Sequence, residues 1–390
     1  MKRNILVAHG GGPTTVMNAS LFGVIDEAAR QAGAGTVYGA IHGVEGVLND
    51  ELLDLSCQDP AQVALLPHTP ASAIGSCRRK LTDADYPRIL EVLKKYDIGC
   101  FFYNGGNDSM DTCNKIAKLA QASGYDLSVI GIPKTIDNDL ALTDHCPGYG
   151  SAARFIANNT RDLWMEVQAM PMYVTILETM GRNAGWLTAA GSLPTYNGKP
   201  CAQLVYLPEY AFNEAAFLAD VDNLLRKQKE ILIVVSEGLA DETGKMIADL
   251  GIVDGFGHKL AGGAAQALCD KVTANLGVRA RAERHGFLGR CSMILQSAQD
   301  REEAIAVGRH AVRLAMAGQT GYMAAIRRES SDPYAWSLTQ VPLEEVANVE
   351  KKFPLAWINE AHNGVTEEFR TYAAPLTGDP LPPYAVLKGR

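Results

Sequence analysis

The sequence predicts an α/β fold with largely parallel sheets, organised as two lobes with a cleft between them. Three short apolar segments, Ile5–Ala8, 99–103 and Val129–Ile132, each run into a loop, two of them rich in glycine and the third in polar residues. Helical patterns follow these loops, and strands that alternate with helices favour parallel sheets. The length of 390 residues exceeds one ordinary domain and therefore favours two lobes.

The composition predicts a soluble globular protein with a sizeable core. Hydrophobic residues make up 47% of the chain and charged residues 21%. No apolar run approaches the roughly 20 residues of a membrane span. The first four residues, MKRN, lead into a short strand rather than into the apolar core of a signal peptide. We therefore expect a cytoplasmic protein that does not enter the membrane.

The formal net charge of −8 argues against nucleic acid as a partner. An anionic substrate would have to bind in a locally basic pocket of this acidic protein, which directs attention to the arginines. The eight cysteines are dispersed, without a CxxC pair or a histidine at zinc-ligand spacing. Most are expected to be reduced thiols that pack as small apolar groups.

The stretch Ser128–Asp139 carries the strongest chemical signal. An apolar strand ends at Pro133, and the turn that follows contains Lys134, Asp137 and Asp139. Polar residues at the carboxyl end of a strand in an open parallel sheet lie where ligands bind. Two carboxylates, a lysine and a hydroxyl suit phosphoryl transfer, with a base, a magnesium ligand and a cation for phosphate oxygens. The alternative is a solvated turn, since Asp and Asn are ordinary turn residues.

Two further loops have the same construction. One is HGGGPT at residues 9–14, and the other is GGNDS at residues 105–109. Glycines let the backbone approach a phosphate closely and turn its N–H groups toward the anion. Each loop alone is a weak signal, but three strand-to-loop junctions together predict a phosphate site.

The remaining elements follow from periodicity and from flanking residues. Apolar residues at helical spacing predict helices, and bounded apolar runs predict strands. Asp300 with Glu303 forms a capping-box-like start to the last helix, which ends at Gly318. The other expected helices are 18–31, 86–96, 147–164 and about 213–229, and the other expected strands are 36–41, 173–177, 203–207 and 231–235.

Five segments together resemble the phosphofructokinases. They are GGNDS at 105–109, PKTIDND at 133–139, PGYGSA at 147–152, ETMGRNAGWL at 178–187 and SEGL at 236–239, in the order and spacing of that family. The resemblance runs from about residue 4 to about residue 325. It implies two Rossmann-like three-layer lobes with the active site in the cleft between them. It also implies phosphoryl transfer to a sugar phosphate, with Mg²⁺ as cofactor.

The resemblance implies a division of the chain as well. Residues 1–140 with about 245–300 would form the phosphoryl-donor lobe. Residues 141–244 with about 301–328 would form the sugar-phosphate lobe, and residues 329–390 a C-terminal extension packed on both lobes.

The GGNDS loop indicates which donor is used. ATP-dependent members usually carry GGDGS, and this chain has Asp108 where that sequence has its third glycine. A carboxylate there fills the space of the nucleotide's α-phosphate and repels it, whereas the shorter pyrophosphate still fits. Lys134, directly before TIDND, also resembles the pyrophosphate-dependent branch, although some ATP-using relatives share it. An ATP-dependent enzyme and a catalytically silent regulatory subunit are the alternatives, and intact Asp137 and Arg182 argue against the second.

The expected magnesium carboxylate of GGD is Asn107 here. The carbonyl oxygen of an amide can still bind Mg²⁺, a hard cation that often keeps several waters. Asp108 is expected to supply the missing charge at this metal site. The donor-binding residues implied by the resemblance are Gly11, Gly12, Arg78, Asp108 and Lys134.

The remaining roles concern the transfer step and the sugar phosphate. Asp137 would act as the base, and Arg182, Lys134 and Asp108 would complete the catalytic set. Arg281 would reach across the interface of a homodimer or homotetramer. The substrate-binding residues implied by the resemblance are Thr135, Ile136, Asp137, Met180, Gly181, Arg182, Glu237, Arg281, Phe287 and Arg290.

The resemblance therefore implies reversible, pyrophosphate-dependent phosphorylation of fructose 6-phosphate. The acceptor range stays open, because a pocket for fructose 6-phosphate can also take sedoheptulose 7-phosphate.

Overall fold

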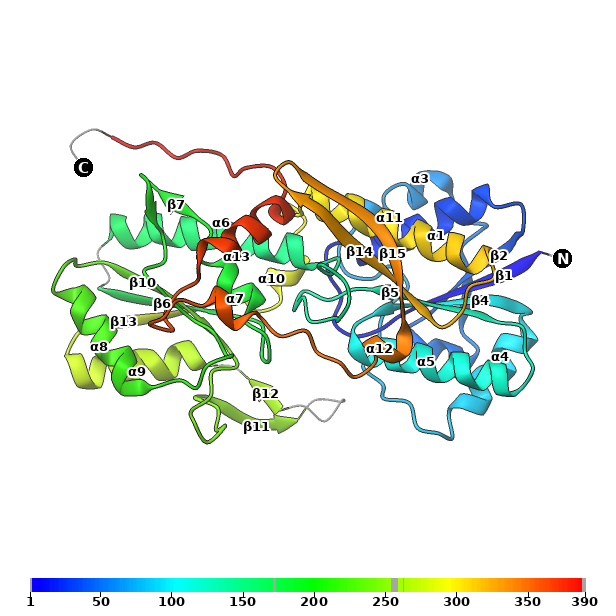
Figure 1. The fold of residues 1–390 in the computed structure, drawn as a ribbon, viewed down its shortest axis with the longest axis horizontal. Coiled ribbons are helices and arrows are strands. Elements are labelled where there is room, and N and C mark those ends of the chain that lie inside the picture. Colours follow the sequence, from blue (N-terminus) through cyan, green and yellow to red (C-terminus); the bar gives the residue numbers. More distant parts are fainter. Residues whose placement is uncertain (1, 171–172, 254–258, 262, 388–390) are drawn as a thin grey trace. The chain divides into compact units, whose positions relative to one another are not determined.

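The structure, a computed structural model, describes residues 2–170, 173–253, 259–261 and 263–387. The chain forms two compact units (Figure 1). Unit 1 contains Met1–Ser151 and Arg290–Lys351, and unit 2 contains Ala152–Gly289 and Lys352–Arg390. Each unit is built on a parallel or mostly parallel sheet covered by helices, which confirms the predicted α/β class.

Unit 1 is built on a seven-stranded sheet in the order β15-β14-β5-β4-β1-β2-β3. Its inner strands run parallel, and an antiparallel strand closes each edge. The strands are β1 Arg3–His9, β2 Ala34–Ala40, β3 Leu52–Asp54, β4 Ile98–Gly105, β5 Ser128–Pro133, β14 Tyr322–Ser331 and β15 Tyr334–Pro342.

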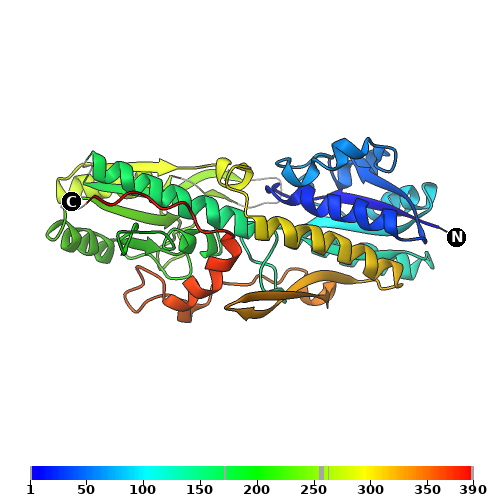
Figure 2. The ribbon, with the colours of Figure 1, turned by 90° about the horizontal axis from the view of Figure 1, so that it is seen from above.

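Helices cover both faces of this sheet, so unit 1 has three layers. Helices α1 and α11 lie side by side on one face (Figure 2), where Leu21 and Val307 share a core with Ile5. Helices α4 and α5 cover the other face. The helices of unit 1 are α1 Met17–Arg30, α2 Val44–Asn49, α3 Pro60–Val63, the 3-10 helix η1 Leu66–His68, α4 Tyr86–Lys95, α5 Asn107–Ala122, α11 Ala298–Met316 and α12 Leu343–Val346.

The inner strands are apolar on both sides because both faces are covered. Along β1, Ile5 and Val7 belong to the core under α1 and α11. Leu6 and Ala8 belong to the core under α4 and α5. This double cover explains why the predicted strand reads as a continuous apolar run.

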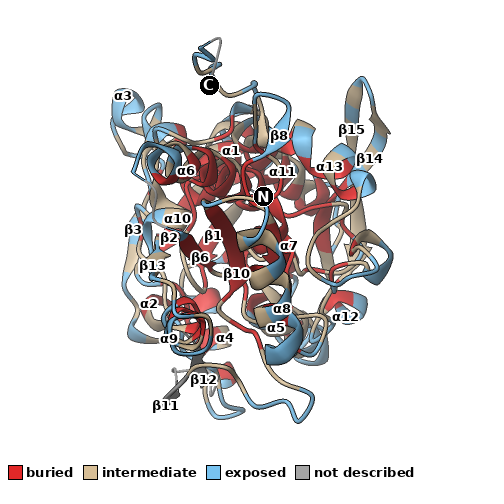
Figure 3. Ribbon diagram, turned by 90° about the vertical axis from the view of Figure 1, so that its left-hand side faces the viewer, coloured by how far each residue is buried: buried red, intermediate tan, exposed pale blue. Residues whose placement is uncertain are grey.

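Unit 2 contains a four-stranded parallel sheet in the order β13-β6-β10-β9. Helices α8 and α9 cover one face, where Phe217 and Leu268 share a core with Ile176. Strands β6 and β10 are buried along their whole length (Figure 3). The elements are β6 Val174–Thr179, α7 Trp186–Ala190, β7 Thr195–Tyr196, β8 Lys199–Pro200, β9 Leu204–Tyr206, α8 Glu214–Leu225, β10 Ile231–Ser236, β11 Asp249–Val253, β12 Lys259–Ala261, α9 Ala264–Leu276, β13 Ala280–Arg284, η2 Leu355–Trp357, α13 Glu367–Ala373 and η3 Ala374–Thr377.

The boundaries of the two units differ from those of the expected lobes. Helix α11, expected in the second lobe, packs on α1 in unit 1. Strand β13, expected in the first lobe, pairs with β6 in unit 2. Two helices, α6 Tyr149–Ala169 and α10 Leu288–Cys291, cross the boundaries between the units. Residues 1, 171–172, 254–258, 262 and 388–390 of the expected regions lie outside the described residues.

Two C-terminal elements also differ from expectation. The hairpin β14–β15 extends the unit 1 sheet beyond β5, whereas residues 329–390 were expected to be an extension packed on both lobes. Helix α11 begins earlier than predicted, because Ser297 caps it by accepting the Asp300 N–H at 3.3 Å. Asp300 is therefore the third residue of the helix, and the capping serine precedes it.

Among the described residues, no helix combines the length and apolar character needed to cross a bilayer. All eight cysteines are free, and Cys100, Cys113, Cys146, Cys201 and Cys269 are buried. Their burial fits the expected role of thiols as small apolar groups.

Candidate active site

The three predicted phosphate loops leave neighbouring strands of the unit 1 sheet at the same edge. Strands β1, β4 and β5 are parallel neighbours, with Gly105 opposite Pro133. Backbone hydrogen bonds continue the pairing into the loops. Gly10 N–H donates to the Asn104 carbonyl at 2.9 Å, and Lys134 N–H donates to the Gly105 carbonyl at 3.0 Å. The sheet thus brings together the loops that the sequence singled out.

Cationic side chains surround Gly12. The Lys134 ammonium donates to the Gly12 carbonyl at 2.8 Å. A β-carbon at residue 12 would lie 2.5 Å from Arg290 Nη1 and 3.3 Å from Arg78 Nη2. A larger residue at position 12 would therefore have to displace the Arg290 guanidinium and crowd that of Arg78. Gly11 precedes it at φ 78°, in the left-handed region.

The crowding of these cations is reflected in the pKa of Lys134. Burial lowers this pKa, and Arg290 and Arg78 lower it further, so that it falls to about 7 despite the nearby carboxylates of Asp137 and Asp139. An anion bound among these groups would offset the repulsion and favour the charged ammonium. The electrostatics of this site therefore suit a polyphosphate.

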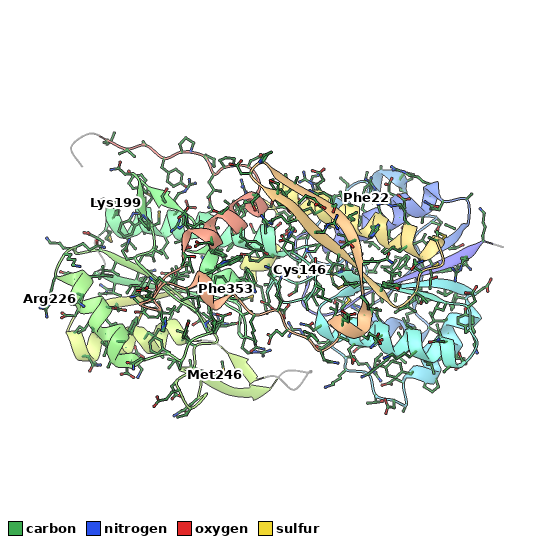
Figure 4. The ribbon with its side chains drawn as sticks, viewed as in Figure 1. Phe22, Cys146, Lys199, Arg226, Met246 and Phe353 are labelled. Carbon is green, nitrogen blue, oxygen red and sulfur yellow. The ribbon has the colours of Figure 1, made fainter. Side chains whose placement is uncertain are left out.

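Residues 134–148, here named the aspartate loop, are fixed by hydrogen bonds of their own. Asp137 N–H donates to Thr135 Oγ1 at 3.1 Å. Asn138 adopts φ 56° and accepts the Cys146 N–H on Oδ1 at 2.9 Å. Cys146 is labelled in Figure 4. Ile136 is buried, so this turn is an ordered part of unit 1 rather than a solvated one.

Asn107 and Asp139 lie together at the start of α5. Asn107 Nδ2 donates to Asp139 Oδ2 at 3.2 Å, while Asn107 Oδ1 is buried without a hydrogen-bond partner. Burial, Asp137 and Glu350 raise the pKa of Asp139 to about 7. An amide oxygen without a partner beside carboxylates that repel each other fits a divalent cation.

Asp108, the residue after Asn107, is exposed in the first turn of α5. Among the described residues, no group of three or more His, Cys, Asp or Glu side chains has a metal-binding arrangement. A cation here would therefore take further ligands from water or from substrate phosphates, as Mg²⁺ commonly does. The sequence indicated a base and a magnesium ligand among the two carboxylates of TIDND, but the predicted metal site was Asn107 with Asp108 and did not include Asp139.

A buried ion network at the far end of the aspartate loop was not foreseen. His145 Nδ1 faces Asp144 Oδ2 at 2.8 Å, and Nε2 faces Glu303 Oε2 at 2.6 Å. Because both ring nitrogens face carboxylates, both carry protons and the ring is charged. Burial alone would lower the pKa of His145, but Glu303 and Asp144 raise it to about 9. Arg328 pairs with Asp144 at 3.0 Å, and Tyr334 donates to Glu303 at 2.6 Å.

The predicted sugar-phosphate residues Met180, Gly181, Arg182 and Glu237 lie in unit 2. The first three follow β6, and Glu237 follows β10, the parallel neighbour of β6. The hydroxyl of Ser236 donates to the Gly181 carbonyl at 2.8 Å and so ties the two loops together. Residues 180–186 are here named the arginine loop.

Glu237 is a partly buried carboxyl group with a shifted pKa. Burial and the neighbouring Glu178 raise this pKa to about 7, against the opposing effects of Gly181, Arg284 and Arg182. A carboxyl group in this range can accept or donate a hydrogen bond near neutral pH. That property suits recognition of sugar hydroxyls, which both donate and accept.

The residues expected at the 6-phosphate are divided between the two units. Arg281 lies on the edge strand β13, with its side chain 56% exposed and an ion pair to Glu283 at 2.6 Å. Phe287, also in unit 2, is 71% exposed. Arg290 belongs to unit 1, where it lies beside Gly12. The structure thus groups Arg290 with donor-side residues, whereas the resemblance grouped it with Arg281.

Comparison with known proteins agrees with these features. The family model described as Phosphofructokinase matches residues 4–315. A protein of Xanthomonas campestris pv. campestris, named pyrophosphate--fructose 6-phosphate 1-phosphotransferase, is 44% identical and covers 99% of this chain and 96% of its own. A Halomonas elongata protein of the same name is 42% identical, and the match covers 98% of this chain and 94% of that protein. The crystal structure of the pyrophosphate-dependent phosphofructokinase from Nitrosospira multiformis matches with a TM-score of 0.89 at 38% sequence identity. The match covers 100% of this chain and 95% of that one. The chain belongs to the phosphofructokinase family.

Proposed function

We propose that this protein transfers a phosphoryl group from pyrophosphate to the 1-hydroxyl of fructose 6-phosphate, giving fructose 1,6-bisphosphate and phosphate. One observation carries the proposal: Lys134, Arg78 and Arg290 converge on Gly12 and form a cationic cradle for a polyphosphate. The names of relatives that match nearly the whole chain supply the donor and the acceptor.

In the forward direction, Asp137 accepts the proton of the 1-hydroxyl as that oxygen bonds to the nearer phosphorus. The bond from that phosphorus to the bridging oxygen breaks, and phosphate leaves. Lys134 and Arg182 stabilise the charge on the transferring group. The reaction is expected to be reversible, because the two phosphate bonds exchanged are closer in free energy than ATP and the sugar ester.

Asn107 and Asp139 are the residues that would hold Mg²⁺, since the unpartnered Asn107 Oδ1 lies on the side chain that contacts Asp139. The bound metal would neutralise pyrophosphate oxygens. Asp108, predicted as a second metal ligand, is proposed to act first as a barrier to the α-phosphate of ATP. Its exposure in the first turn of α5 is compatible with facing an incoming donor.

The sugar-phosphate side is proposed as the resemblance implied it. Glu237 would bind sugar hydroxyls, and Arg281 would bind the 6-phosphate. Arg290, beside Gly12, is placed to bind the donor instead of or in addition to that phosphate. The full set of proposed substrate-binding residues is Thr135, Ile136, Asp137, Met180, Gly181, Arg182, Glu237, Arg281, Phe287 and Arg290.

A homodimer or homotetramer is proposed as the assembly. The exposed surface of Arg281 on an edge strand and of Phe287 supports it, because a second subunit would remove this surface from water. Light scattering after gel filtration tests the assembly. A cytoplasmic location is supported by the eight free thiols, since reducing compartments keep cysteines unpaired.

The donor assignment is tested directly. Purified protein is given fructose 6-phosphate and Mg²⁺ with either pyrophosphate or ATP, and formation of the bisphosphate is followed. We expect turnover with pyrophosphate and little with ATP. Equal rates would support the ATP-dependent alternative, and no turnover with either donor would support a silent regulatory subunit.

A further inference from the structure

We propose that Lys351 is a positioning residue for the aspartate loop, supplied by a C-terminal segment that lies outside the residues matched by the family model. This inference rests on the proposed role of Asp137 in catalysis. Its structural part, that Lys351 orders the loop, is tested independently of activity.

The Lys351 side chain binds the aspartate loop at several points. Its ammonium donates to the carbonyls of Thr143 and Asp144 at 3.2 and 2.9 Å. The same nitrogen lies 3.4 Å from Asn138 Oδ1, which also accepts the Cys146 N–H. One cation therefore joins the beginning and the end of a turn that reverses the chain between residues 138 and 146.

The backbone of the same segment pairs with the loop. Lys351 N–H donates to the Asp139 carbonyl at 2.7 Å. Glu350 forms an isolated antiparallel bridge with Leu140, which is fully buried. This short backbone pairing, at Asp139 and Leu140, holds Lys351 where its side chain can reach the loop.

These contacts act on Asp137 through Asn138. Asn138 adopts φ 56°, a conformation that costs a non-glycine residue free energy and persists where its surroundings hold it. Removing the ammonium would take this donor away from the part-buried carbonyls of Thr143 and Asp144, which favours relaxation of the turn. Asp137 is the adjacent residue, and a misplacement of about 1 Å at a reacting group can cost about 10²-fold in rate.

Lys352 provides a matched comparison. It is the next residue and has the same side chain, but it is exposed and its ammonium donates to the Asn183 carbonyl, in the arginine loop of unit 2, at 3.2 Å. Water can replace a hydrogen bond at an exposed site, so the loss of this contact has a smaller effect.

The experiment compares Lys351→Met with Lys352→Met, because methionine keeps most of the apolar stem and removes the donors and the charge. Hydrogen exchange by mass spectrometry is followed over residues 136–147 and 180–187. We expect Lys351→Met to accelerate exchange over 136–147 and leave 180–187 unchanged. We expect its kcat to fall about 10- to 100-fold while the KM values for both substrates change little. Lys352→Met should keep kcat near that of the wild type.

The outcomes separate the possibilities. Unchanged exchange over 136–147 in Lys351→Met would overturn the inference. Faster exchange with an unchanged kcat would also overturn it, since the loop would then be ordered without effect on catalysis. If the wild type turns over neither donor while exchange changes as expected, the proposed function fails and the ordering role stands. If Lys351→Met does not fold, Lys351→Gln replaces it with the same readouts, and failure of both to fold would assign Lys351 to global stability instead.

Discussion

The aspartate loop and the arginine loop are held by different kinds of interaction. In the aspartate loop, His145 lies between two carboxylates and Lys351 binds backbone carbonyls. The arginine loop ends at Trp186, which is buried against aromatic rings of the C-terminal segment. Those rings belong to Phe353, Trp357 and Tyr372, with centroids 5.0, 6.0 and 5.4 Å from that of Trp186.

The two kinds of interaction have different effects on the loops that they hold. Hydrogen bonds to charged groups depend strongly on angle, so they fix the orientation of the loop that carries the proposed base. Aromatic packing depends mainly on buried area and tolerates small rotations. The polar network should also respond to pH, whereas the aromatic cluster should not. Substitutions of four residues, each with a control or a second measurement, test this contrast from the largest expected effect to the smallest.

The chemistry of the aspartate loop gives the largest effect. Asp137→Asn should lower kcat by about 10²- to 10⁴-fold, as expected for the loss of a general base, while folding is preserved. Steady-state kinetics with pyrophosphate measures it. The control is Asp126→Asn, an aspartate whose side chain is 97% exposed and which should show normal rates. Near wild-type turnover in Asp137→Asn would remove this residue from the mechanism.

Among these substitutions, loss of the aromatic packing around Trp186 should cause the largest loss of folding stability. Trp186→Ala should lower the free energy of unfolding by about 3–5 kcal/mol, as other large-to-small aromatic changes in cores do. Denaturation in urea, followed by circular dichroism, measures this loss. Trp186→Phe, which keeps an aromatic ring, should lose less. A loss of stability that differs between pH 6.5 and pH 9.5 would show that this aromatic cluster is sensitive to pH after all.

The buried imidazolium makes the aspartate loop sensitive to pH. The pKa of His145 is about 9 in the folded protein and 6.5 for an unperturbed histidine, so the folded state binds this proton more tightly. The resulting stabilisation is complete below pH 6.5, declines as the pH rises, and is lost above pH 9. It amounts to about 3 kcal/mol. The stability difference between wild type and His145→Gln should shrink by about this amount from pH 6.5 to 9.5, and a constant difference would show that the ring is not charged.

The smallest effect is expected at the GGNDS loop of residues 105–109. Asp108→Gly should raise kcat/KM for ATP about fivefold, since a like charge about 4 Å away in water costs about 1 kcal/mol. Asp108→Asn separates charge from size, because it removes the charge and keeps the volume. A changed Mg²⁺ dependence in both variants would assign Asp108 to the metal as well. No change for either donor would leave Lys134 as the sole sequence feature that favours pyrophosphate.

Much of the site could be predicted because its residues are contiguous. One strand leads directly into Lys134, Thr135 and Asp137, and another leads into GGNDS. The local pattern, together with the rule that ligands bind at the carboxyl ends of parallel strands, is enough to find them. The contact between Asn107 and Asp139 needed the register of β4 against β5, which no single segment encodes.

Contacts between distant segments could not be predicted. His145 binds Glu303, 158 residues away, and the only local sign was a histidine next to an aspartate. Lys351 lies in a tail without a recognisable motif. The hairpin β14–β15 was not predicted as part of the sheet. Its place there depends on the pairing of β14 with β5, which the sequence of the hairpin does not indicate.

The way unit 1 is assembled from two separated segments has a consequence for synthesis of the chain. Strand β14 covers the open edge of β5 but begins at Tyr322, after all the residues that follow Pro133 up to that point have been made. At translation rates of about 5–20 residues per second, β14 is synthesised roughly 10–40 s after β5. During that interval the backbone groups of β5 are available to other nascent chains. Slow translation, or release of a chain that ends before β14, should therefore favour aggregation over folding.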